Sequence, residues 1–126
     1  MKRFVWLVMA ICMLGNPASA KDVCIQHVGT QLVLSKVKLP NAGAAVPLVG
    51  FFNAPYTPPL EGSITRLKNG ELLVAATYYL LGATCFERVY VDETLSGSGV
   101  VECTSDLSDD LVVTWTRIDC KNVTIP

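Results

Sequence analysis

The chain predicts an all-β fold, a small up-and-down antiparallel β-barrel of about eight strands with two disulfides. β-branched and aromatic residues occur in short runs between Gly, Pro, Asn, Asp and Ser, and no apolar stripe of helical spacing follows residue 20. The later runs form a meander, and the cysteines predict a tie between the first and last strands, which favours a closed sheet without exposed edges. A two-sheet β-sandwich is the alternative architecture.

Residues 1–20 have the organisation of a secretory signal peptide. A positively charged start is followed by an apolar run over residues 4–14 and by a small-residue ending at Ala20. The apolar run is about half as long as the roughly 20 residues that a transmembrane helix requires. We therefore expect cleavage after Ala20, a secreted or periplasmic product with no membrane span, and a single domain over residues 21–126.

The charge of this expected product excludes some partners. Without Lys2 and Arg3 the chain keeps eight Lys and Arg against eleven Asp and Glu, a net charge of −3, and its cations do not cluster. Binding to nucleic acid requires clustered cations, so we expect no nucleic-acid partner. A small apolar ligand or an extracytoplasmic protein remains as the expected partner.

The cysteines after residue 20 are even in number, as in small exported domains with structural disulfides. They are Cys24, Cys85, Cys103 and Cys120. With no Cys-x-x-Cys pair and one histidine, no metal site or cofactor is predicted. If strands over residues 84–91 and 99–104 are joined by a loop centred near residue 94, Cys85 lies opposite Cys103 and the two can be bridged. Cys24 and Cys120 then pair by elimination.

The expected strands are, in chain order, residues 24–28, 31–39, 46–52, 62–67, 71–81, 84–91, 99–104 and 111–118. Asn69-Gly70 predicts a type I′ turn between the fourth and fifth strands, with Lys68 facing Glu71. Gly82-Ala83 predicts a second tight turn, followed by longer connections after residues 91 and 104. The proline-rich segment 53–59 is expected to be a loop or an edge, because proline lacks the N–H that a central strand donates.

Alternation of side chains along the strands predicts which residues face the core. Tyr78 shares the apolar face of its strand. In residues 84–91 one face carries Glu87 and the other Arg88, so either orientation brings a charge inward. In the last strand Arg117 shares a face with Trp115. Because a buried unpaired charge is costly, any inward charge must be paired or must reach water.

Two arrangements satisfy this requirement. In a ligand-binding barrel, Glu87 and Arg117 lie near a wet mouth while Tyr78 and Trp115 line a pocket, and these four are the candidate ligand-binding residues. In a filled barrel the charge is paired internally or lies at a strand end. A barrel of this length is usually filled by its own side chains, which favours the second arrangement.

No pattern in the sequence predicts an enzyme. His27 has no serine elbow or other nucleophile motif to support it, and a lone histidine is more often a surface or packing residue. The acidic segment with Asp106, Asp109 and Asp110 matches no calcium-binding loop, and aspartate is common in turns. We therefore expect no catalytic residues and no bound metal.

The expected function is that of an exported, non-catalytic binding protein for a small molecule or a protein. One alternative is an inhibitor of an extracellular hydrolase. Ser96-Gly97-Ser98-Gly99 resembles a loop of small exported barrels that inhibit lysozymes, although the aromatic residue that such inhibitors present after Ser-Gly is missing here. The other alternative is a structural or surface-assembly component, in which the aromatic end of the apolar segment 44–52 is exposed.

Overall fold

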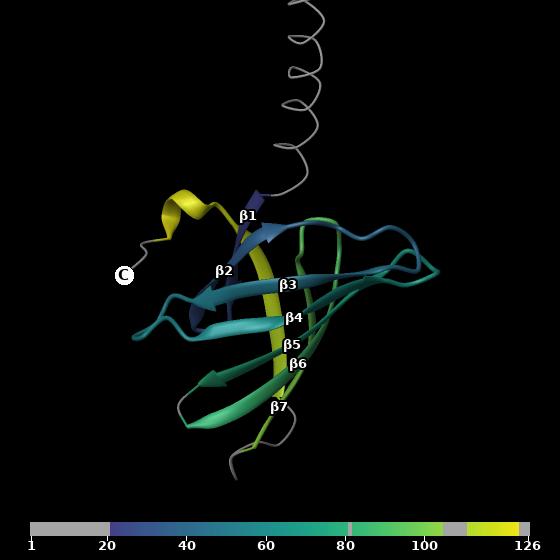
Figure 1. Ribbon diagram of the computed structural model, residues 1–126. Coiled ribbons are helices and arrows are strands. Elements are labelled where there is room, and N and C mark those ends of the chain that lie inside the picture. Colours follow the sequence, from purple (N-terminus) through teal and green to yellow (C-terminus); the bar gives the residue numbers. More distant parts are fainter. Residues whose placement is uncertain (1–20, 81, 105–110, 124–126) are drawn as a thin grey trace, which may run out of the picture.

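The computed structural model describes residues 21–80, 82–104 and 111–123, which form a closed barrel of eight antiparallel strands (Figure 1). The predicted barrel is confirmed, and the sandwich alternative is wrong. The elements are β1 (Lys21–His27), β2 (Thr30–Val37), β3 (Ala45–Phe52), β4 (Pro59–Arg66), β5 (Leu72–Leu80), β6 (Ala83–Val91), β7 (Gly97–Cys103), β8 (Leu111–Ile118) and the 3-10 turn η1 (Cys120–Asn122). The predicted signal peptide and the acidic segment 105–110 lie outside the described residues. Within the described ranges, no helix has the length and apolar character needed to cross a membrane.

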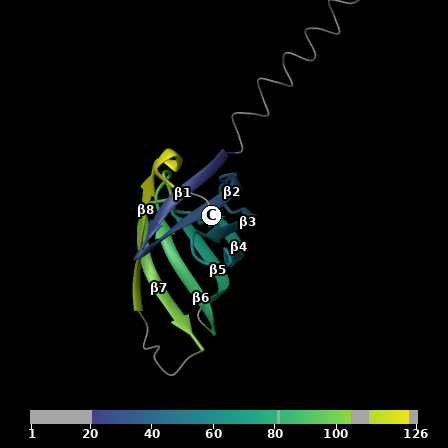
Figure 2. The ribbon, with the colours of Figure 1, turned by 90° about the vertical axis from the view of Figure 1, so that its left-hand side faces the viewer.

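Each strand pairs with the next along the chain, and β8 returns to pair with β1. Figure 2 shows β1 and β8 side by side, where His27 lies opposite Trp115. Both predicted disulfides are present. Cys85 and Cys103 are register partners on β6 and β7, and Cys24 of β1 is bonded to Cys120, directly after β8. The second bond therefore fastens the seam that closes the barrel, and two disulfides are consistent with an oxidising environment.

The barrel interior is filled by the inward faces of the strands. β6 shows strict alternation, with every second residue from Ala83 to Val91 buried, and β5 buries the predicted face that includes Tyr78. The largest fully buried side chains in the described part are apolar except for Glu87, and they include Trp115 and Phe52. Glu87, which the filled-barrel arrangement required to be paired, therefore lies within the core itself.

The hairpin between β4 and β5 forms where the sequence predicts it but with a different turn. Gly70 has a φ of +92° while Asn69 does not have the positive φ that a type I′ turn requires. The Gly70 N–H donates to Leu67 O and the Leu67 N–H donates to Glu71 O, which gives a three-residue loop. The Asn69 side chain accepts from the Glu71 N–H at 3.0 Å, and this local bond holds the alternative turn.

The Ser96 to Gly99 segment does not form a protruding loop. β7 begins at Gly97, and a Cβ atom on Gly97 or Gly99 would overlap the Tyr90 or Arg88 carbonyl oxygen of β6. These glycines allow close approach of two paired strands, so they serve the barrel wall.

Candidate functional site

A polar cluster lies at the centre of the barrel, built around the Glu87 carboxylate. Oε1 accepts from the Tyr78 hydroxyl at 2.8 Å and is 2.8 Å from His27 Nε2, while Oε2 accepts from Trp115 Nε1 at 2.7 Å. Glu87 is fully buried, and the other three side chains are at most 6% exposed. One carboxylate on β6 therefore contacts side chains from three other strands, β1, β5 and β8.

Strand register brings these side chains together. On β5 and β6, Glu87 lies opposite Ala76 and Tyr78 opposite Cys85, so both point inward from neighbouring strands. On β1 and β8, His27 and Trp115 are register partners, and they face Glu87 from across the barrel. The His27 ring also contacts Phe52 edge-on, with centroids 5.0 Å apart. The cluster thus depends on closure of the barrel between β8 and β1.

The electrostatics of the cluster explain how a carboxylate is kept in the core. Tyr78 remains a proton donor, because burial and, secondarily, the charge and hydrogen bond of Glu87 raise the pKa of its hydroxyl well above the ordinary value. The Trp115 indole is only a donor, and His27 supplies a further hydrogen bond. No buried side-chain polar atom in the described ranges lacks a partner. The inward charge is therefore paired inside the barrel.

The structure brings together three of the four candidate ligand-binding residues, Tyr78, Glu87 and Trp115, in the buried centre of the barrel. Glu87 was expected near a wet mouth and instead has no exposed surface. His27, which was expected to be a surface or packing residue, is the fourth member of the cluster. Alternation along β1 could have indicated its position, because Val23, Ile25 and His27 share one buried face.

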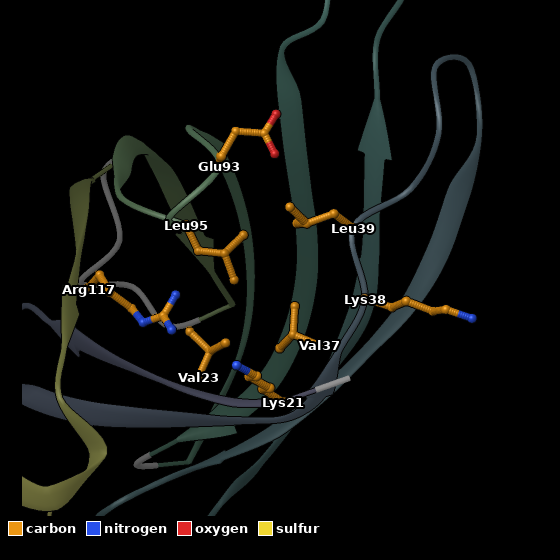
Figure 3. A pocket seen from close by; sticks show the side chains of 8 residues that line it. All are labelled: Lys21, Val23, Val37, Lys38, Leu39, Glu93, Leu95 and Arg117. Atoms are coloured by element: carbon orange, nitrogen blue, oxygen red, sulfur yellow. The ribbon is translucent and has the colours of Figure 1, made fainter. Parts of the chain in front are cut away.

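Arg117 is separated from this cluster and lies at one end of the barrel. It borders an open pocket of about 420 Å³ with Lys21, Val23, Val37, Lys38, Leu39, Glu93 and Leu95. Figure 3 shows the apolar side chains of this set converging on the middle of the pocket, with Arg117 and Lys21 extending over it. We call this pocket the barrel mouth. It combines an apolar floor with charged groups at the rim, as small-molecule sites often do.

The loop between β6 and β7 shapes the barrel mouth and is held by hydrogen bonds to Asp92. Asp92 Oδ1 accepts from the Thr94 hydroxyl at 2.5 Å, from the Thr94 N–H at 2.8 Å and from the Ser96 N–H at 3.2 Å. These bonds, that of the hydroxyl foremost, lower the pKa of Asp92. Leu95 adopts a φ of +68°, and its side chain is only 1% exposed. The loop therefore presents Leu95 as part of the floor.

Side chains on both sides of this loop fix its position further. Arg117 donates from its backbone N–H to Ser96 Oγ at 2.9 Å and from Nη1 to Thr94 O at 3.2 Å. Arg66 forms a two-pronged ion pair with Glu93, with N–O distances of 2.7 and 3.2 Å, which lowers the pKa of Glu93. The one carboxylate at the rim is therefore already paired.

The apolar segment around β3 does not form an exposed aromatic surface. Phe52 is fully buried and Phe51 is half-buried, whereas Tyr56 in the following loop is fully exposed.

The described residues also contain no group of three or more His, Cys, Asp or Glu placed to hold a metal ion.

Comparisons of the chain with protein families, with curated proteins and with solved structures find no match. The geometry of the barrel mouth and of the filled interior therefore carries the functional proposal.

Proposed function

We propose that the protein is an exported, non-catalytic binding protein whose ligand is a small molecule held at the barrel mouth. The observation that carries this proposal is the contrast between the filled interior of the barrel and its open mouth. The interior is filled, and its carboxylate is bonded to three partners, whereas the barrel mouth leaves about 420 Å³ beside converging apolar side chains. This volume lies within the range of about 300–1,000 Å³ that is typical of small-molecule sites.

Export is part of this proposal. The signal-like residues 1–20 end immediately before β1, so cleavage after Ala20 would release the whole barrel without removing a paired strand residue. The two disulfides suit the oxidising compartment that such a signal leads to. The inhibitor alternative gains no support from the Ser96 to Gly99 segment, because Gly97 to Gly99 are part of β7 and so of the barrel wall.

The test is native mass spectrometry of the processed protein recovered from its own host, with two matched variants. Val37→Trp places a bulky side chain in the barrel mouth, whereas Val49→Trp makes the same change at a half-exposed position of β3 away from that pocket. We expect a small-molecule adduct on the wild type and on Val49→Trp, absent from Val37→Trp. An adduct that survives Val37→Trp would refute the mouth as the site.

A further inference from the structure

The barrel mouth carries an excess of positive charge in a protein that is acidic as a whole. Lys21, Lys38 and Arg117 line it against one carboxylate, Glu93, which is already paired with Arg66. Figure 3 shows Lys21 and Arg117 extending toward the pocket, while Lys38 points away from it. Two cations over an apolar floor form a surface that suits an anion attached to an apolar group.

Arg117 is fixed in a position to receive such an anion. Its Nη1 donates to Thr94 O at 3.2 Å, and its backbone N–H donates to Ser96 Oγ at 2.9 Å, so both ends of the residue are tied to the same loop. A guanidinium has five N–H donors, and this side-chain bond uses one of them. The remaining donors suit the oxygens of a carboxylate or phosphate group.

The apolar floor suits the other half of the ligand. Val23 and Leu95 are 5% and 1% exposed and form its base, while Leu39 at the edge is 37% exposed. An alkyl chain lying along Leu39 and Val37 would remove apolar surface from water. The small volume and open shape favour a short chain with its head group at the rim.

Processing of the signal peptide would add a further cation at this rim. Lys21 is the residue that cleavage after Ala20 makes the first of the chain, and its backbone pairs with Val37, another lining residue. The new terminus would therefore be held at the mouth by β1. An α-ammonium group has an ordinary pKa of about 7.7–8.0, below that of lysine or arginine.

Resting on the proposed function, we propose that the ligand is an anionic amphiphile, a carboxylate or phosphate head on a short alkyl chain, and that the α-ammonium of Lys21 completes its site after signal cleavage. Charged side chains line this pocket and the adjoining pocket that shares Arg117 with it: Lys21, Lys38, Arg117 and Glu93, together with Asp22 and Asp119. Asp22 Oδ1 accepts from the Lys36 N–H at 3.0 Å, so it is engaged within the β1–β2 hairpin. The precursor, which lacks the free ammonium, would bind the same anion more weakly.

The experiment is calorimetric titration of the processed protein with octanoate, octyl phosphate and the uncharged octanol. Arg117→Gln removes the fixed guanidinium, and Arg88→Gln is the matched control on the outer face of β6. We expect octanoate to bind about tenfold more tightly than octanol and to lose about tenfold in affinity in Arg117→Gln, with no change in Arg88→Gln. Whichever of the two anions binds more tightly identifies the head group.

The role of the α-ammonium has its own test. Acetylation of the N-terminus should weaken octanoate binding by about threefold to fivefold, as expected for a partly exposed ion pair. Between pH 6.5 and 9 the affinity of the unmodified protein should fall, while that of the acetylated protein stays constant, since the Lys and Arg side chains keep their charge. Equal affinities before and after acetylation would overturn this role.

The failure of the ligand class is distinguishable from the failure of the binding site. If octanol binds as tightly as octanoate and Val37→Trp abolishes both, the barrel mouth remains the site and the anionic ligand is wrong. If the adduct seen in native mass spectrometry is insensitive to Val37→Trp, the proposed function itself is wrong.

Discussion

Glu87→Met removes the one carboxylate acceptor that three buried side chains share, and its coupling to Tyr78→Phe tests the interpretation of the interior cluster. In the wild type, Tyr78→Phe loses a hydrogen bond to the carboxylate, in which the two oxygens lie 2.8 Å apart. A hydrogen bond to a charged group is worth about 1.5–3 kcal/mol, so we expect Tyr78→Phe to destabilise the wild type by that amount. The methionine fills most of the volume of the glutamate, so the main loss is the acceptor.

In the Glu87→Met background the same substitution should have the opposite sign. The Tyr78 hydroxyl is buried and would have lost its acceptor, which costs about 1–3 kcal/mol, and Phe removes that hydroxyl. The two lower bounds together give a coupling free energy of at least about 2.5 kcal/mol between positions 78 and 87. Tyr79→Phe is the matched control, because Tyr79 is 62% exposed on the other face of β5 and should change stability by less than about 0.5 kcal/mol in either background.

The assay is urea unfolding of the processed protein at 25 °C with the disulfides intact. Circular dichroism is the signal, since Trp115 belongs to the cluster and its fluorescence responds to the substitutions directly. Melting temperatures provide a second measure of the sign, because about 1 kcal/mol shifts the midpoint of a domain of this size by roughly 4–8 °C. A Tyr78→Phe cost that is the same with Glu87 and with Met would refute the view that the three donors depend on this carboxylate.

Three further predictions concern stability. Because burial and Glu87 raise the pKa of Tyr78, the unfolded chain loses this proton above about pH 10 while the folded chain keeps it. The free energy of unfolding should therefore fall by up to about 1.4 kcal/mol per pH unit above pH 10. Urea titrations from about pH 8 to 11 should show this slope in the wild type but not in Tyr78→Phe, and the same pH dependence in both proteins would contradict the prediction. Replacing Cys24 and Cys120 together by serine removes a disulfide with a sequence separation of 96. The free energy of unfolding should fall by about 4–5 kcal/mol by the chain-entropy estimate, as measured by urea unfolding. A decrease below about 1 kcal/mol would count against this prediction. Gly99→Ala should lower the free energy of unfolding by about 1–3 kcal/mol in thermal unfolding, because its Cβ would overlap Arg88 O. Gly29→Ala is the control and should be nearly neutral, since no atom lies near its Cβ. Similar decreases at both sites would show that close approach of β6 and β7 is not the cause.

Much of the barrel could be predicted from the sequence because the information is local. A period of two along β5 identifies the buried face that includes Tyr78, and proline and glycine mark the breaks between strands. The disulfide pairing followed from register, since Cys85 and Cys103 are equidistant from the loop that joins their strands. The turn at Asn69-Gly70 was placed correctly but assigned to the wrong type, because Asn69 bonds to the Glu71 backbone in place of adopting a positive φ.

The sequence by itself determined that a charge on β6 must enter the core, but only the tertiary structure decided that it is Glu87 and not Arg88. The reason is that the donors are remote in sequence: Trp115 and His27 come from the two strands that meet when the barrel closes, and Tyr78 comes from the neighbouring strand. With three donors converging on one carboxylate, Glu87 is stable inside, and Arg88 faces outward beside Glu102 at 3.9 Å. Arg117 shares the inward face of β8 with Trp115 but lies beyond the end of the filled core. Its side chain therefore reaches water at the barrel mouth.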